Sequence, residues 1–129
     1  METLARRVLE EAATNGLEIT IHHGEGGSTV HLLGHLNIES SPTFRDRLLA
    51  MLQARPPQAV IVDFSDVSYV DSSGIATLIE GLKMARQRQT TLCLRGLQGR
   101  LLHLFQVKGM STLFEKNCRE SALSASKVP

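Results

Sequence analysis

The residues best suited to carry chemistry are an aspartate and two serines in the middle of the chain. Asp71-Ser72-Ser73-Gly74 comes directly after an apolar segment and directly before a helical pattern. Serine and aspartate are preferred at helix N-termini, where a side-chain oxygen accepts a hydrogen bond from an unpaired backbone N–H. A single capping residue is sufficient there. Either Asp71 or Ser72 caps the helix and this stretch does nothing more, or a hydroxyl has a second role, as a nucleophile or as an acceptor for phosphate.

A nucleophilic serine is the weaker of these two interpretations. The Gly-x-Ser-x-Gly elbow is absent, and no serine, histidine and acid arrangement is visible in the sequence. A serine at a helix N-terminus presents its hydroxyl beside unpaired N–H groups, so a phosphate there is tolerated. The phosphate adds about 1.5 to 2 negative charges, enough to prevent binding of an apolar partner surface that must exclude water from this position. We therefore expect no enzymatic activity, and a switch that acts through an interface.

Four histidines, His22, His23, His31 and His35, raise the question of a metal site. In a strand, His31 and His35 share a face but stand about 13 Å apart, too far to share an ion, and His22 and His23 point to opposite faces. The glycine pair in Gly96-Leu97-Gln98-Gly99 lacks the Lys-Ser/Thr of a phosphate-binding loop. We expect neither a metal nor a cofactor.

Composition limits the remaining classes. The chain has 129 residues, 42% of them hydrophobic, which suits one domain with one core. The formal net charge is +1, so no strong field favours direct nucleic-acid binding. No apolar run approaches the roughly 18 residues that insert into a membrane. The two cysteines, Cys93 and Cys118, do not look like a disulfide framework, and a cytoplasmic location is expected.

Hydrophobic periodicity predicts the elements that position the serines. The helix after the motif is expected from Ile75, Leu78, Ile79 and Leu82, which share one helical face and run on to about Gln89. Strands are expected at Leu17 to His22, Thr29 to Leu36, Ala59 to Phe64 and Thr90 to Leu94, with a brief edge strand at Leu113 to Glu115. Further helices are expected at Glu2 to Ala13, from Ser40-Ser41-Pro42 to near Ala54, and at Gly99 to Val107.

This order of elements predicts the fold class and the domain limits. We expect a single α/β domain, with a mixed sheet of four to five strands and helices packed mainly on one face. The domain proper is predicted at residues 17–117. Residues 1–16 are an N-terminal extension, expected to be a short amphipathic helix that ends at Asn15-Gly16, and residues 118–129 are a polar tail.

The stretch Asp63-Phe64-Ser65-Asp66-Val67-Ser68-Tyr69-Val70-Asp71-Ser72-Ser73-Gly74-Ile75 resembles a strand, loop and helix start of the STAS domain family, of the bacterial anti-sigma factor antagonist type. Leu33-Gly34-His35-Leu36-Asn37 resembles the family's Gly-x-Leu-Asp element, and Leu101 to Phe114 its closing helix and final strand. The resemblance spans about Leu17 to Glu115.

What the resemblance implies is a phosphoregulated binding protein. The unphosphorylated antagonist would bind an anti-sigma factor that is itself a serine kinase, and so release a sigma factor. Ser72 would receive the phosphate, and a cognate phosphatase would remove it. A homodimer is left open. The residues implied at the partner surface are Asn37, Asp71, Ser73, Gly74, Ile75 and Ala76.

Asn37 stands where the family usually has an aspartate, which removes a carboxylate near the partner surface. The alternative hypothesis is therefore a STAS protein that is not switched by phosphorylation. It would be a scaffold or regulatory subunit of a stress-sensing assembly or of a lipid-transport ABC system.

Overall fold

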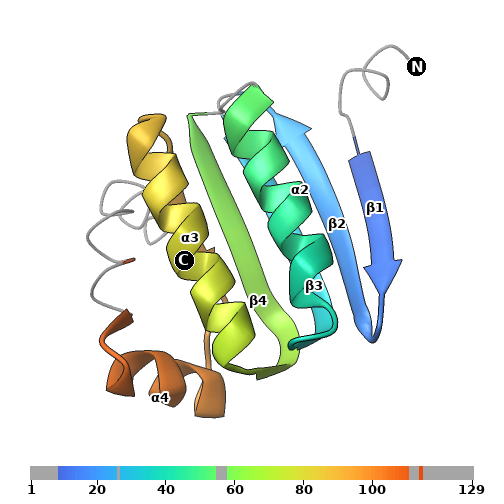
Figure 1. The fold of residues 1–129 in the computed structure, drawn as a ribbon, viewed down its shortest axis with the longest axis vertical. Helices are drawn as coiled ribbons and strands as arrows, with labels where there is room; N and C mark the ends of the chain where they lie inside the picture. Colours follow the sequence, from blue (N-terminus) through green and yellow to red (C-terminus); the bar gives the residue numbers. More distant parts are fainter. Residues whose placement is uncertain (1–8, 26, 55–57, 111–113, 115–129) are drawn as a thin grey trace, which may run out of the picture.

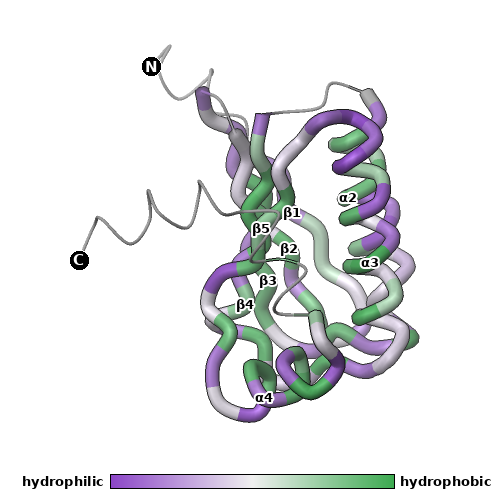
Figure 2. Tube along the Cα trace, turned by 90° about the vertical axis from the view of Figure 1, so that its left-hand side faces the viewer, coloured by the Kyte–Doolittle hydropathy of each residue, from purple (hydrophilic) through white to green (hydrophobic). Residues whose placement is uncertain are grey.

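The computed structural model describes residues 9–25, 27–54, 58–110 and 114. Five strands form one mixed sheet in the order β1-β2-β3-β4-β5, with helices α2 and α3 side by side on one face (Figures 1 and 2). The predicted fold class is confirmed. The strands are β1 (Leu9–Thr14), β2 (Leu17–Gly24), β3 (Gly27–Leu36), β4 (Ala59–Val70) and β5 (Thr91–Arg95). The helices are α2 (Ser41–Ala54), α3 (Ser72–Gln87) and α4 (Gly99–Val107).

The core lies between the sheet and the two helices. Side chains alternate along β2, so that Leu17, Ile19 and Ile21 are buried while their neighbours are not. Phe44 of α2 and Leu78 of α3 are fully buried. Each fully buried large apolar side chain contributes about 1.5 to 3 kcal/mol. This burial holds α3, and with it the Ser72 segment, against the sheet.

Strand pairing places the ends of β3 and β4 next to each other. β1, β2 and β3 pair antiparallel, whereas β3 pairs parallel with β4, and β4 with β5. Leu36 is the register partner of Val70 at the carboxyl ends of β3 and β4. Parallel neighbours end at the same edge of a sheet, so the segments that follow them, beginning at Asn37 and Asp71, leave the sheet together.

The prediction of a helix in the N-terminal extension is wrong for residues 9–14, the part of that helix that the structure describes. Leu9–Thr14 is strand β1, paired along its length with β2, and residues 1–8 lie outside the described part. Asn15 and Gly16 have φ angles of 44° and 86°, as a type I′ hairpin turn requires. Without β1, the backbone N–H and C=O groups along one side of β2 would have no strand partner. Their pairing with β1 outweighs the helix propensity of the glutamates and alanines in residues 9–14.

Other boundaries differ from the prediction by one or two residues, and those of β4 and α3 differ by more. β4 continues past Phe64 to Val70, because Val67 and Val70 add buried side chains while Ser65 and Asp66 face outward. Helix α3 starts at Ser72, one turn earlier than its apolar face indicated. The predicted edge strand at 113–115 falls mostly outside the described residues, and Phe114 within it is helical and buried.

Helices α2 and α3 are joined on their outer side by one bidentate ion pair. The Arg45 Nε and Nη2 atoms donate to the two Glu80 carboxylate oxygens at 2.7 and 2.6 Å. The hydrogen bond from Arg45 is the main cause of a lowered pKa at Glu80. Both side chains are exposed, so screening by water keeps the contribution of this pair to stability small.

We predict that Gly34→Ala destabilises the fold by about 2 kcal/mol or more. Gly34 has a φ angle of +118°, and an added Cβ would lie 2.0 Å from the Gly16 carbonyl oxygen. Urea denaturation measures the change. Gly24→Ala is the matched control, since its added Cβ meets its nearest atom at 3.7 Å. Equal stability of the two variants would contradict the predicted steric role of Gly34.

Candidate functional site

Asp71 caps helix α3 through its side chain. Its Oδ1 atom accepts hydrogen bonds from the backbone N–H groups of Ser73 at 2.9 Å and Gly74 at 3.2 Å. The Ser73 hydroxyl donates to the same oxygen. The hydrogen bond from the Ser73 side chain is the largest influence on the pKa of Asp71, which lies below its usual value. The carboxylate is therefore charged and fixed at neutral pH.

The same carboxylate also holds the loop that follows β3. Its Oδ2 atom accepts a hydrogen bond from the Ile38 N–H at 3.1 Å. The Asp71 N–H donates to the Leu36 carbonyl oxygen at 3.1 Å. Asp71 thus joins the start of α3 to residues 37–40, which come from a distant part of the sequence.

The two serines of the motif have different surroundings. The Ser73 hydroxyl is half-buried, bonded to Asp71 and 3.3 Å from the Ser41 Oγ. Ser72 is exposed, and its hydroxyl makes no hydrogen bond to any residue that the structure describes. The structure therefore separates a hydroxyl with an internal role from one that faces solvent, a distinction that the sequence alone did not make.

Asn37 closes a tight turn before α2. Its Oδ1 atom accepts hydrogen bonds from the N–H groups of Glu39 at 3.0 Å and Ser40 at 3.1 Å. An amide oxygen accepts such bonds as a carboxylate oxygen does. Asparagine therefore preserves the geometry of this loop without adding a second negative charge beside Asp71. Its chain neighbours Leu36 and Ile38 are both hydrogen-bonded to Asp71, which places Asn37 near the motif.

The remaining predicted partner residues divide by exposure. Gly74 is buried, and a Cβ there would lie 2.8 Å from Leu36 Cγ, so the absence of a side chain permits the close approach of α3 to β3. Ile75 is only 7% exposed and belongs to the core. Ala76 is exposed and stands four residues after Ser72, on the same side of the helix. Gly74 and Ile75 can affect a partner only by positioning their exposed neighbours.

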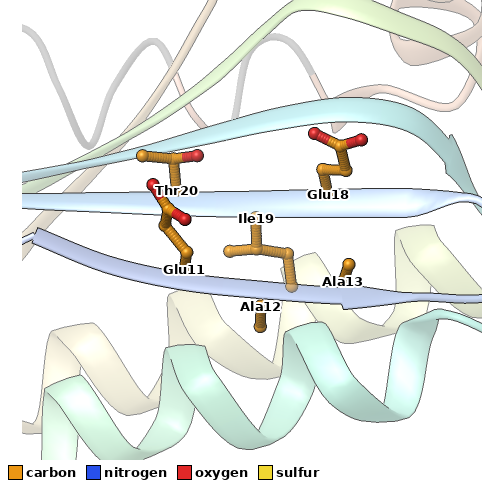
Figure 3. A pocket seen from close by; sticks show the side chains of 6 residues that line it. All are labelled: Glu11, Ala12, Ala13, Glu18, Ile19 and Thr20. Atoms are coloured by element: carbon orange, nitrogen blue, oxygen red, sulfur yellow. The ribbon is translucent and has the colours of Figure 1, made fainter.

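A hollow of about 350 Å³ opens beside β1 and β2, away from the Ser72 motif. Figure 3 shows the Glu11 side chain between the two strands, near Thr20, and Glu18 farther along β2. Within residues 9–25, 27–54, 58–110 and 114, no three potential metal ligands gather at one point. None of the residues lining this hollow belongs to the predicted site.

The four clustered histidines are mostly engaged by protein groups. The His31 Nε2 atom lies 2.7 Å from Asp66 Oδ2. The two ring nitrogens of His23 also have partners, Nε2 at 3.0 Å from Glu10 Oε2 and Nδ1 at 2.8 Å from Ser28 Oγ. His35 packs edge-on against Tyr69, with ring centroids 6.3 Å apart. These contacts account for three of the histidines without a ligand.

Sequence reasoning missed three residues at this site. The Ser41 hydroxyl lies within hydrogen-bond distance of Ser73, 32 residues away in the sequence. Ile38, which is bonded to Asp71, is 72% exposed, and Tyr69, two residues before Asp71, is 52% exposed. An apolar residue next to the Asn37 turn was the available signal for Ile38. The exposure of Tyr69 depended on the unpredicted continuation of β4.

Comparison with known proteins identifies the family. The profile described as "Mlab, STAS domain" matches residues 19–115, which is most of the chain. The chain belongs to the STAS domain family. Of the helices in the described part of this STAS chain, none has the length and apolar character needed to cross a membrane.

Two curated relatives of this STAS chain are named anti-sigma-B factor antagonists. The anti-sigma-B factor antagonist of Listeria monocytogenes is 31% identical over 86 residues, covering 67% of this chain and 75% of the relative. The anti-sigma-B factor antagonist of Bacillus subtilis is 24% identical over 99 residues, covering 77% of this chain and 89% of that protein. Both alignments cover most of the domain.

Solved structures share the fold of this STAS domain. An anti-sigma factor antagonist from Mycobacterium paratuberculosis has a TM-score of 0.64 at 20% identity, over 80% of this chain and 86% of that one. A sulfate transporter family protein from Wolinella succinogenes has a TM-score of 0.59 at 23% identity, over 69% and 71% of the two chains. At these identities the likeness concerns the fold.

We predict that Asp71→Ala lowers the free energy of unfolding by about 1 to 2 kcal/mol, because α3 loses its cap and residues 37–40 lose their attachment. Chemical denaturation at neutral pH measures the loss. Glu25→Ala is the control, since Glu25 is an exposed turn residue whose side chain makes no hydrogen bond within the described part. An equal effect of the two substitutions would contradict the capping role.

We also predict that the stability of the protein falls in acid. The pKa of Asp71 is lowered, chiefly by Ser73, and that of Glu80 chiefly by Arg45. Burial acts to raise the pKa of Asp63, but hydrogen bonds from Ser65 and Arg95 outweigh it and the net pKa is lowered. A lowered pKa stabilises the fold above the unfolded-state value of about 4, and this stabilisation is lost as the pH falls through the folded-state value.

Thermal unfolding between about pH 6 and pH 3 tests the prediction for Asp71. The Asp71→Asn variant has no carboxylate to protonate at this position, so its stability should decline less than that of the wild type. A decline of the same size in both proteins would show that Asp71 contributes nothing to the pH dependence.

Proposed function

We propose that the chain is a phosphoregulated anti-sigma factor antagonist. Unphosphorylated, it binds an anti-sigma factor that is a serine kinase, and so releases a sigma factor. The role follows the curated relatives, which are anti-sigma-B factor antagonists. The observation that carries the phosphorylation step is the exposed hydroxyl of Ser72, which is free of hydrogen bonds to the described residues, at the N-terminus of α3.

The local structure favours Ser72 over Ser73 as the acceptor. A kinase needs a hydroxyl that can reach the γ-phosphate of ATP, and the exposed Ser72 meets that condition. Phosphorylation of Ser73 would break its bond to Asp71 and force a dianion against that carboxylate. The same change at Ser72 disturbs no hydrogen bond between described residues, so the fold can carry it.

A phosphate on Ser72 would change binding more than folding. The positive end of the α3 dipole favours an anion at this position. In a complex, however, the phosphate would lie beside the charged Asp71 carboxylate and would lose water on contact with the partner. Like-charge repulsion and desolvation both oppose binding. Phosphorylation therefore releases the partner without unfolding the antagonist.

The contact surface we propose follows the exposed side of the motif. Ser72 and Ala76 face outward on α3, and Asn37 holds the adjoining loop. Asp71 and Ser73 fix the geometry of the helix start through the hydrogen bond between their side chains. Gly74 and Ile75, predicted at the partner surface, are buried and support it.

An unswitched STAS scaffold or regulatory subunit is the second candidate. One fold neighbour comes from a sulfate transporter family, so this fold also occurs among proteins whose names do not mention anti-sigma factors. The Asp71 cap would serve that role equally well without phosphorylation. The two candidates differ in what happens at Ser72.

The proposal predicts a single phosphate on Ser72. The chain is incubated with ATP and the anti-sigma-type serine kinase of the same genome, and intact mass and peptide mass spectrometry locate the modification. Ser72→Ala should abolish it, whereas Ser73→Ala, the adjacent matched control, should keep it. Ser72→Asp should weaken binding to the kinase by about tenfold or more.

Two outcomes would count against this function. One is a wild-type chain that binds the kinase but receives no phosphate at Ser72, which favours the unswitched candidate. The other is a phosphate that forms at Ser72 while Ser72→Asp binds as tightly as the wild type, which would remove the switch.

A further inference from the structure

Large apolar side chains are exposed mainly near the carboxyl ends of β3 and β4, where α3 begins with Ser72. Among the described residues the exposed ones are Ile38 at 72%, Val107 at 69%, Tyr69 at 52% and Leu33 at 44%. Three of these four, all but Val107, stand on the last residues of β3 and β4 or on the loop that follows β3. Exposed apolar groups that gather in one region mark an interaction site more often than scattered ones do.

Hydrogen bonds and strand pairing connect two of these side chains to the motif. Ile38 donates its N–H to the Asp71 carboxylate, so its side chain is carried on the loop anchored at the start of α3. Tyr69 lies two residues before Asp71 on β4 and is the register partner of His35 on β3. The His35 and Tyr69 rings meet edge-on, which orients the tyrosine on the sheet surface.

Leu33 extends the group along β3. It lies two residues before the exposed His35, and its own neighbour Leu32 is fully buried. Alternation along a strand therefore places Leu33 on the sheet face opposite the core. In Figure 2 both α2 and α3 lie on the core side of the sheet, so neither covers this face. We call Leu33, His35, Ile38 and Tyr69 the tip patch.

The tip patch has no evident part in stability. Its three apolar members leave 44 to 72% of their surface in water, so they gain little from folding. The adjoining residues Leu36 and Val70 are buried and supply the packing at this end of the sheet. A side chain that folding does not use, on a rigid strand or an anchored loop, is well suited to bind another protein at low entropic cost.

We propose that the tip patch is the apolar part of the surface that binds the kinase partner, with Ile38 and Tyr69 as its main contacts. This inference rests on the proposed function. The partner would present a complementary apolar surface, because Ile38 and Tyr69 offer mostly hydrocarbon and aromatic area. The contact continues from the α3 N-terminus, past Ile38, onto the sheet face opposite α2 and α3.

This arrangement gives a reason for the effect of phosphorylation. Ile38 is attached to the carboxylate of the residue directly before Ser72, so the phosphate forms beside an apolar contact. Bringing an apolar partner surface over that site would require a dianion to lose its water. The tip patch thus supplies affinity, and Ser72 decides whether that affinity is available.

Binding of the kinase to immobilised chain, measured with ADP present, tests the proposal. Ile38→Ser and Tyr69→Ser should each weaken binding by about tenfold or more, as truncations of central contacts do. Val107→Ser is the matched control, since Val107 is as exposed as Ile38 but stands at the end of α4, outside the patch. Thermal unfolding of each variant shows that the fold is kept.

Phosphorylation of Ser72 and the oligomeric state are recorded for the same proteins. If the wild type binds and is phosphorylated while both patch variants bind normally, the tip patch is overturned and the proposed function stands. If the patch variants lose binding but the wild type receives no phosphate, the patch stands and the switch fails. If the wild type does not bind the kinase, both fall. A self-associating wild type that Tyr69→Ser makes monomeric, with unchanged kinase affinity, would assign the patch to a second copy and overturn the proposal.

Discussion

The Asp71 carboxylate accepts hydrogen bonds from two directions, and the arrangement of the whole site depends on this. One oxygen binds the first N–H groups of α3, and the other binds the N–H of Ile38 in the loop after β3. The bond from the Ser73 hydroxyl also keeps the pKa of Asp71 low, so the carboxylate stays charged at neutral pH. A neutral side chain at this position would bind the helix and the loop less strongly. The exposed residues of the two segments would then no longer be fixed relative to each other.

This carboxylate can join the two segments because the sheet brings them together first. β3 and β4 run parallel and end side by side at Leu36 and Val70. Gly74 then lets α3 begin close against these same two residues, since a Cβ would lie 2.8 Å from one and 3.0 Å from the other. Close packing of Gly74 against the core therefore fixes the backbone position of Ser72, while the Ser72 side chain stays in solvent.

Internal hydrogen bonding and solvent exposure are divided between neighbouring residues. Asp71 and Ser73 make the hydrogen bonds that the helix start requires, so Ser72 can be modified without a loss of those bonds. The same division holds around them, where Leu36 and Val70 are buried and Ile38 and Tyr69 are exposed. A surface built in this way can gain or lose a partner while the fold beneath it stays unchanged.

The sequence by itself determined the fold class, the hairpin of β2 and β3, and the apolar faces of α2 and α3, because periodicity reports which side of an element is buried. It also located the motif at a helix start. It failed for Leu9–Thr14, where local propensity favoured a helix but the Asn15-Gly16 turn and the edge of β2 favoured a strand. Only the tertiary structure decided which serine hydroxyl has a partner among the described residues, because that depends on the direction of the Asp71 carboxylate and on Ser41, 32 residues from Ser73. The exposure of Ile38 and Tyr69 was likewise a tertiary result, since it follows from where two distant strands end.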